Sequence, residues 1–128
     1  MSRNDELKAL TTSWNDAWNS KDASALASFF AEGATYYEPD FTEPQDGASG
    51  IAAVAEKTWA DWPEASFEQV SMTVEDPRVV LEWRSTATHR SGTILNLEGV
   101  DVLTWSGDKL ASARAYYDVH ARKSALGE

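Results

Sequence analysis

The amino-acid sequence predicts an α+β domain in which helices come first and a long antiparallel sheet follows. Apolar residues recur at spacings of three and four in the first half, as on a helix with one buried face. From residue 66 onward, long segments of β-type composition alternate with short turn sequences, and such connections join antiparallel neighbours. With 128 residues, 42% of them hydrophobic, the chain suits one folded domain rather than a disordered segment. We therefore expect a single domain over residues 1–128: three N-terminal helices packed in a curved, mainly antiparallel sheet that forms a cone-shaped α+β barrel.

Each expected helix has a sequence signal at one of its ends. We expect the first helix over residues 5–20, a second helix that ends at Gly33, and a third helix over residues 49–62. Ser, Asp and Asn side chains bind the free backbone N–H groups at helix starts, whereas glycine and proline end helices. The residues that we assign to these roles are Asn4 or Asp5, Asp22 or Ser24, Gly33 and Pro63.

One short strand and four long strands are expected after the second helix. The short strand covers residues 35–38 and ends at Pro39, because the residue before a proline is restricted to extended conformations. A loop over residues 39–49 follows it. The four long strands are expected over residues 66–75, 78–90, 93–105 and 109–120, with turn sequences between them.

Asp101 is the most informative residue of the expected sheet. It lies in the middle of the strand at 93–105, and side chains alternate between the two faces of a strand. The residues on its face are otherwise apolar or small: Leu97, Gly99, Leu103 and Trp105. An ionised carboxylate on such a face is costly unless it is paired, so we expect Asp101 to have a raised pKa or a dedicated partner.

A run of small side chains on the last strand points to an internal cavity. One face of that strand carries Ala111, Ala113 and Ala115, and it ends with Tyr117. Protein cores are close-packed, so either a helix approaches this face closely or the space is a cavity. We favour the cavity, because His89 and Asp101 are expected to face the same side of the sheet.

Composition excludes several kinds of site. The chain has no cysteine, which excludes disulfides, thiolate nucleophiles and cysteine-based metal sites. Its net charge is −10, and residues 1–76 hold 15 acidic against 4 basic side chains, so we expect neither nucleic acid nor an anionic membrane as a partner. His89 and His120 show no metal-ligand spacing and no phosphate-binding loop is visible, so we expect no metal and no cofactor. The absence of a long apolar stretch and of a signal peptide predicts a cytoplasmic protein.

Four segments of the chain together resemble one known superfamily. They are residues 14–22 (WNDAWNSKD), 29–39 (FFAEGATYYEP), 99–102 (GVDV) and 107–118 (GDKLASARAYYD). In this order, with the expected helices and strands, they are similar to the nuclear-transport-factor-2-like superfamily. The most similar members are its SnoaL-like polyketide cyclases and ketosteroid isomerases. The resemblance covers nearly the whole chain and implies the same cone-shaped fold.

The isomerases of this superfamily hold an oxyanion with a tyrosine on the first helix and a protonated aspartic acid on the third long strand. The resemblance matches that acid to Asp101, and a carboxylic acid stays neutral in this way when its site is apolar. Glu38, followed by Pro39, matches the base that moves the proton, with Asp40 as the alternative base. Trp14 stands in place of the tyrosine, and its indole N–H donates a hydrogen bond but is a weaker acid than a phenol.

The SnoaL-like cyclases remove a proton next to a carbonyl group and close a ring, without a metal or cofactor. They use an inward aspartate with a histidine nearby, which the resemblance matches to Asp101 and His89. Limonene-epoxide-hydrolase relatives share the fold, but their last-strand aspartate falls at Ala115. The resemblance therefore implies that epoxide hydrolysis of that kind is absent here.

Together these observations predict a cofactor-free enzyme of the isomerase or aldol cyclase type, which acts by general acid/base catalysis on a small apolar carbonyl compound. The candidate catalytic residues are Asp101, Glu38 and His89. The candidate substrate-binding residues are Trp14, Trp18, Tyr36, Trp59, Trp83 and Tyr117. The alternative is a non-catalytic small-molecule-binding or dimerisation domain on the same scaffold, because a fold does not fix a function. In either case we expect a homodimer through the outer sheet face, which would carry Glu82, Arg84, Thr86, Thr88, Val100 and Val102.

Overall fold

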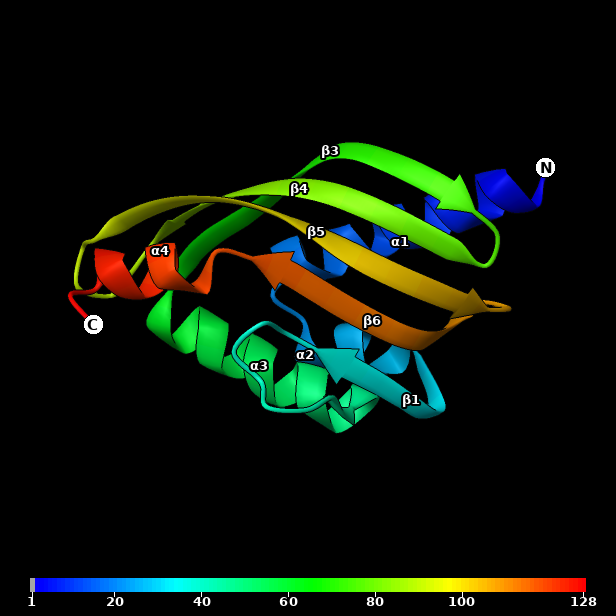
Figure 1. Cartoon of the computed structure of the whole chain (residues 1–128), viewed down its shortest axis with the longest axis horizontal. Coiled ribbons are helices and arrows are strands. Elements are labelled where there is room, and N and C mark those ends of the chain that lie inside the picture. Colours follow the sequence, from blue (N-terminus) through cyan, green and yellow to red (C-terminus); the bar gives the residue numbers. More distant parts are fainter. Residues whose placement is uncertain (1) are drawn as a thin grey trace.

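The computed structural model of the chain describes residues 2–128. Its elements follow one another in the order helix–helix, two strands, helix, four strands and a final helix (Figure 1). The elements are α1 (Arg3–Ser20), α2 (Ala23–Ser28), β1 (Phe30–Tyr37), β2 (Gln45–Asp46), α3 (Gly47–Asp61), β3 (Glu64–Glu75), β4 (Arg78–Thr88), β5 (Ile94–Ser106), β6 (Lys109–Tyr117) and α4 (Val119–Ala125). The α+β class that the sequence predicts is confirmed.

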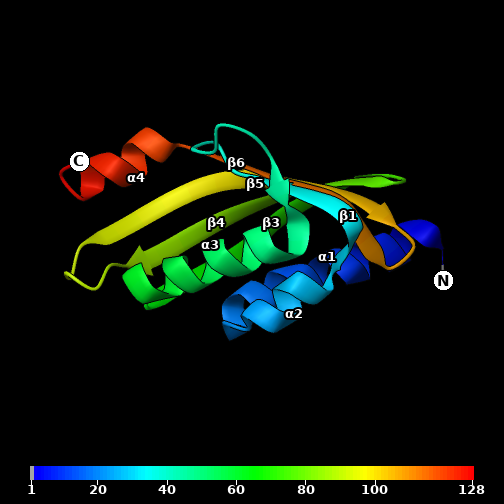
Figure 2. The same ribbon diagram turned by 90° about the horizontal axis from the view of Figure 1, so that it is seen from below.

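The described strands form one curved sheet in the order β2-β1-β6-β5-β4-β3. Every neighbouring pair is antiparallel except β1 and β6, which run parallel. The sheet wraps around α1, α2 and α3 on one of its faces, and β2 and β3 remain as free edges (Figure 2). The architecture is therefore an open cone, with the helices inside the curve of the sheet.

The hydrophobic core lies between these helices and the inner sheet face. On β4, buried and exposed side chains alternate along the strand, as expected for a sheet with one face exposed to solvent. Leu81 and Leu103 are fully buried on the inner face, together with Trp14 from α1. On the outer face, Arg84 is exposed and lies 3.6 Å from both Glu68 and Glu98 in ion pairs. The homodimer expected on this face stays a prediction.

The first helix begins earlier than its sequence signal indicated, and the second ends sooner. Ser2 caps α1, because its hydroxyl accepts the Asp5 backbone N–H at 3.1 Å, so the expected caps Asn4 and Asp5 were wrong. The second helix ends at Ser28, whereas Gly33 lies within β1 at φ 79°. The cause is a distant contact: the Leu110 N–H donates to the Phe29 carbonyl at 2.7 Å and starts the pairing of β1 with β6.

The third helix and the last strand also differ from the expected bounds. The loop expected at 39–49 contains the short strand β2, and Asp46 caps α3, which starts at Gly47. The strand expected at 109–120 ends at Tyr117, and residues 119–125 form the helix α4. Asp118 caps this helix, because its carboxylate accepts the Ala121 N–H at 2.9 Å. The polar cap therefore turns the chain out of the sheet.

A register irregularity in β6 changes which alanines face inward. The pairing with β5 shifts between Thr104 and Trp105, so Trp105 pairs with Leu110 and not with Ala111. As a result Leu110 is buried and Ala111 is exposed, whereas Ala113 and Ala115 are buried as expected. The inward run of three alanines was wrong by this one residue.

Candidate functional site

A largely apolar cavity lies between α1, α3 and the inner face of β3 to β6. Its volume of about 110 Å³ holds several waters or a small organic molecule. Aromatic side chains from four elements form much of its wall: Trp14, Trp18, Tyr36, Trp83 and Tyr117. Its ionisable side chains besides the tyrosines are Asp101, Glu38 and Arg122.

Asp101 projects from the middle of β5 toward the first helix. It pairs across the sheet with Leu81 on one side and Ala115 on the other, and only 9% of its surface is exposed. The Trp14 indole N–H donates to its Oδ2 at 3.1 Å, and the Trp83 indole N–H donates to its Oδ1 at 3.0 Å. Asp101 therefore has the dedicated partners that the sequence called for, and they are two tryptophans.

The pKa of Asp101 is set by two opposing effects. Burial removes water from the carboxylate and raises the pKa from 3.8 to about 6, whereas the two indole N–H groups lower it. The balance leaves a carboxyl group that is mostly ionised at neutral pH and takes up a proton readily. Both partners stabilise the ionised form, because an indole only donates.

Glu38 follows β1 directly and lies at another part of the same cavity wall. Burial raises its pKa from 4.5 to about 7, and the negative charges of Asp40 and Asp101 add to this rise. The Tyr36 hydroxyl and the Arg122 guanidinium act in the opposite direction. A carboxyl group with a pKa near 7 can give and take a proton at neutral pH, which is what general acid/base chemistry needs.

Arg122 on α4 connects the C-terminal helix to the segment that follows β1. Its Nη1 donates to the Tyr117 hydroxyl at 3.0 Å, and its Nη2 donates to Asp40 at 3.0 Å. Asp40 is therefore bound in an ion pair, whereas Glu38 lies on the cavity wall. Sequence reasoning missed Arg122, because it treated residues 118–120 as strand. A helix signal was present in the sequence: Asp118 can cap a helix start, and Arg122 and Lys123 are basic residues of the kind that favour a last helical turn. This signal predicts a C-terminal helix that carries Arg122.

The structure does not bring His89 to the cavity. It lies beyond the end of β4, where its ring packs against Trp62 with centroids 4.8 Å apart and its Nδ1 is 2.9 Å from the Ser91 hydroxyl. Trp59 also lies off the cavity wall, packed against Trp18 at 6.0 Å. The remaining predicted site residues, Trp14, Trp18, Tyr36, Glu38, Trp83, Asp101 and Tyr117, surround the cavity.

Within residues 2–128, no three His, Asp or Glu side chains gather in a way that could hold a metal ion. No helix in the described part of the chain has both the length and the apolar character needed to cross a bilayer.

Comparison with protein families gives one match, to the SnoaL-like domain, over residues 11–113. This match covers the second half of α1, the helices α2 and α3, and the sheet as far as the middle of β6. A comparison with curated proteins gives no significant match.

Solved structures with the same fold span nearly the whole chain. AclR, a candidate hydroxylase from Streptomyces galilaeus, is 23% identical, with a TM-score of 0.84 over 97% of this chain and 86% of that one. A candidate polyketide cyclase from Xanthomonas campestris pv. campestris is 15% identical, with a TM-score of 0.87 over 98% and 99% of the two chains. A protein of ketosteroid isomerase-like fold from Catenulispora acidiphila, in complex with trimethylamine, is 20% identical, with a TM-score of 0.82 over 92% of each chain. At these identities the likeness establishes the fold.

Proposed function

This chain belongs to the SnoaL-like family, and on that premise we propose that it is a cofactor-free enzyme of the isomerase or aldol cyclase type. Its substrate would be a small, largely apolar carbonyl compound bound in the cavity. One observation carries this proposal: the half-buried Glu38 and the buried Asp101 are two carboxyl groups with raised pKa values on the wall of one mostly apolar cavity. Buried titratable groups of this kind are typical of sites for proton transfer.

Glu38 is the better placed of the two as the base. Its pKa of about 7 makes it the stronger proton acceptor, and it becomes ionised near neutral pH. In the proposed reaction, its carboxylate takes the proton from the carbon next to the carbonyl group. The electron pair of that C–H bond then forms the enolate.

The second half of the reaction returns a proton. In an isomerisation, a carboxylic acid group gives the proton to another carbon of the enolate. In an aldol cyclisation, the enolate carbon first bonds to a second carbonyl carbon, and the new alkoxide takes the proton. Glu38 in its protonated form, or the protonated fraction of Asp101, can supply it.

The geometry changes the role that the sequence suggested for Asp101. We expected a proton-bearing donor to the enolate oxygen, but both carboxylate oxygens already accept an indole N–H. These donors favour the ionised form. We therefore assign Asp101 as a second proton acceptor, which takes up and releases a proton during turnover. It does not act as a permanently protonated hydrogen-bond donor.

The related structures support a small-molecule site on this scaffold. The Xanthomonas protein is described as a candidate polyketide cyclase, and the Catenulispora protein was solved with trimethylamine. The apolar wall and the chain's net charge of −10 both favour a ligand without negative charge.

Proton exchange tests this proposal without knowledge of the natural substrate. Small cyclic ketones and 1,3-dicarbonyl compounds are incubated with the protein in D₂O, and loss of the hydrogens next to the carbonyl group is followed by ¹H NMR. We expect the protein to accelerate exchange, Glu38→Gln to abolish the acceleration, and Asp101→Asn to reduce it. Glu43→Gln is the matched control, because Glu43 is an exposed residue of the segment between β1 and β2.

The alternative is a binding protein without catalysis. The observation in its favour is that Asp101 already has structural partners on both oxygens. Saturable binding of the carbonyl compounds with no acceleration of exchange would support that alternative and refute the enzyme.

A further inference from the structure

The two indole N–H groups that contact Asp101 are not available to a negatively charged substrate oxygen. Trp14 and Trp83 both line the cavity, but each uses its single N–H on Asp101. An enolate formed in the cavity needs a hydrogen-bond donor aimed at its oxygen, because such donors stabilise the charge that develops in the transition state. The donor is therefore a side chain other than Trp14 or Trp83, and the cavity wall carries several side chains with an O–H or N–H group.

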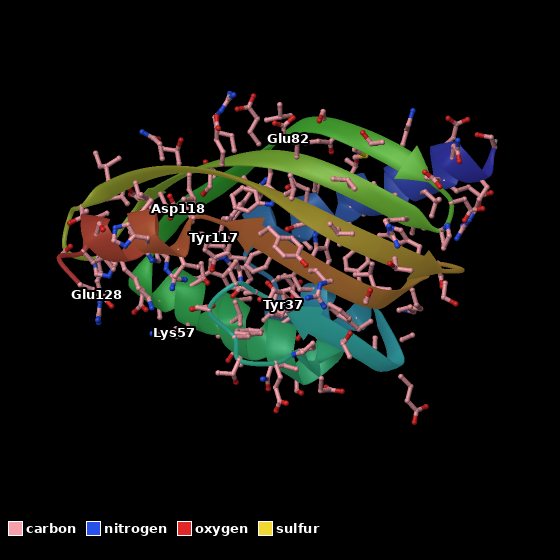
Figure 3. All side chains as sticks on the ribbon, viewed as in Figure 1. Tyr37, Lys57, Glu82, Tyr117, Asp118 and Glu128 are labelled. Carbon is pink, nitrogen blue, oxygen red and sulfur yellow. The ribbon has the colours of Figure 1, made fainter. Side chains whose placement is uncertain are left out.

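Tyr117, the last residue of β6, has the geometry for this role. Figure 3 shows it beside Asp118, where the strand ends and α4 begins. Its ring lines the cavity and packs against Trp83, with centroids 6.1 Å apart. Its hydroxyl oxygen accepts the Nη1–H of Arg122 at 3.0 Å. A phenol has one hydrogen to donate, so a hydroxyl whose oxygen accepts from Arg122 keeps that hydrogen for a group in the cavity.

Arg122 is held in place by its own partners. Its Nη2 donates to Asp40 at 3.0 Å, and its guanidinium carbon lies 5.7 Å from the centre of the Tyr117 ring. Farther along the chain, Leu126 packs against the small apolar cluster of Trp62, Ala65 and Ala87. These contacts fix the cation beside the phenol oxygen. A cation at that position draws electron density from the O–H bond and makes it a stronger donor.

The negative charge of Glu38, which acts on the Tyr117 hydroxyl, moves in the proposed reaction. In the free protein, the Tyr117 hydroxyl interacts with the Glu38 carboxylate. When Glu38 takes the proton from the substrate carbon, its own charge is neutralised and the negative charge passes to the substrate oxygen. The substrate oxygen then replaces Glu38 as the negatively charged acceptor for the Tyr117 hydroxyl, so this hydrogen bond strengthens as the reaction proceeds.

We propose that Tyr117 is the hydrogen-bond donor to the substrate's carbonyl oxygen and that Arg122 is the positioning residue for its hydroxyl. This assignment rests on the proposed function, since it supplies the donor that proton abstraction requires. It also specifies the orientation of the substrate. The carbonyl oxygen lies toward the end of β6, and the apolar part lies toward Phe67, Leu95 and Leu97 on the same cavity wall.

Binding of 4-nitrophenolate tests the donor separately from turnover. This anion mimics the charge of an enolate oxygen, and its visible absorbance reports binding. The test uses Glu38→Gln as background, which removes a competing negative charge and keeps the shape. We expect Tyr117→Phe in this background to weaken binding by roughly tenfold to a hundredfold, the usual range for a hydrogen bond to a charged group.

Tyr116→Phe in the same background is the matched control. Tyr116 is the preceding residue of β6, and its hydroxyl also accepts from an arginine, Arg114, at 2.7 Å. It is exposed on the outer sheet face, so its loss should change 4-nitrophenolate binding by less than about threefold. Equal binding in the Tyr117→Phe and Tyr116→Phe proteins would overturn the assignment, as would a complete lack of binding to the Glu38→Gln protein.

Arg122 is tested by rescue. In the same background, Arg122→Met should weaken 4-nitrophenolate binding, and Arg122→Lys should restore part of it, with equal thermal unfolding temperatures showing that α4 stays folded. A loss with Arg122→Met but not with Tyr117→Phe would make Arg122 itself the donor and refute the role of Tyr117. Binding that depends on Tyr117 in a protein that does not accelerate hydrogen exchange would refute the proposed function alone.

Discussion

Trp83 on β4 lies directly opposite Gly99 on β5, and the missing side chain at position 99 gives the indole the space from which it reaches Asp101. A Cβ atom at Gly99 would overlap the six-membered ring of Trp83 and would lie 2.7 Å from the Tyr116 carbonyl oxygen. The glycine that shares a face with Asp101 is therefore part of how this carboxylate is bound.

Gly99→Ala is expected to disturb the site through Trp83. Because the new methyl group is confined between an indole and a backbone carbonyl, we expect a loss of about 1–3 kcal/mol in the free energy of unfolding. Chemical denaturation measures it. Gly50→Ala is the control, since a Cβ there meets only Gln45 at 3.0 Å and alanine favours the helix. Equal stability of the two variants would contradict the role given to Gly99.

Trp14→Phe is expected to raise the pKa of Asp101 above its value of about 6, because the indole N–H that it removes lowers that pKa. Loss of this hydrogen bond should also cost about 1.5–3 kcal/mol of stability. Titration of the Asp101 carboxyl carbon by NMR measures the change. In the control, Trp105→Phe, the lost indole N–H donates to Thr11 at 3.3 Å and not to Asp101, so the pKa should stay in place.

Stability is expected to depend on pH through Asp101 in an unusual direction. Its pKa is higher in the folded protein than in the unfolded chain, so the folded state holds the proton more tightly. The contribution of Asp101 to the free energy of unfolding is therefore fully present below about pH 4, and it is lost as the pH rises through about 6. A change from 3.8 to about 6 corresponds to roughly 3 kcal/mol.

The Asp101→Asn protein supplies the reference for this measurement, because it cannot titrate at this position. The stability of the wild type relative to this variant should fall from pH 4 to pH 7, by an amount on the order of 3 kcal/mol. A difference that stays constant over this range would contradict the raised pKa.

The sequence alone was sufficient to predict which residues of β5 lie on the inner face of the sheet, because the alternation of side chains along a strand is a local property. It placed Asp101 among apolar neighbours and required a raised pKa or a partner, and both hold in the structure. It did not reveal that the partners would be Trp14 and Trp83. The contact with Trp14 depends on the packing of α1 against the inner sheet face, which brings together residues 87 positions apart, and the contact with Trp83 depends on the register of β4 with β5.

The errors arose where distant contacts override a local pattern. Phe29 and Phe30 continue the apolar period of α2, yet Phe30 starts β1 because the strand pairs with Leu110. At the other end of the chain, Val119 extends the alternation of β6, but Asp118 caps a helix there. This second error hid Arg122 and with it the setting of Tyr117.

Asp118→Ala is expected to loosen α4. The lost cap should cost about 1 kcal/mol in stability and should speed amide hydrogen exchange at Ala121 and Arg122. Asp118→Asn, which keeps an oxygen acceptor, should retain most of the protection. If exchange at Ala121 is equally slow in the alanine variant, the cap does not hold the helix that carries Arg122.

The central claim is that Glu38 and Asp101 are proton-transfer groups of one cavity, and the pH titration of their carboxyl carbons by NMR tests it most directly. We expect Glu38 to titrate at about 7 and Asp101 at about 6, because burial opposes their ionised forms. Titration of both groups near their ordinary values of 4.5 and 3.8 would mean that water reaches them freely, and would contradict the account.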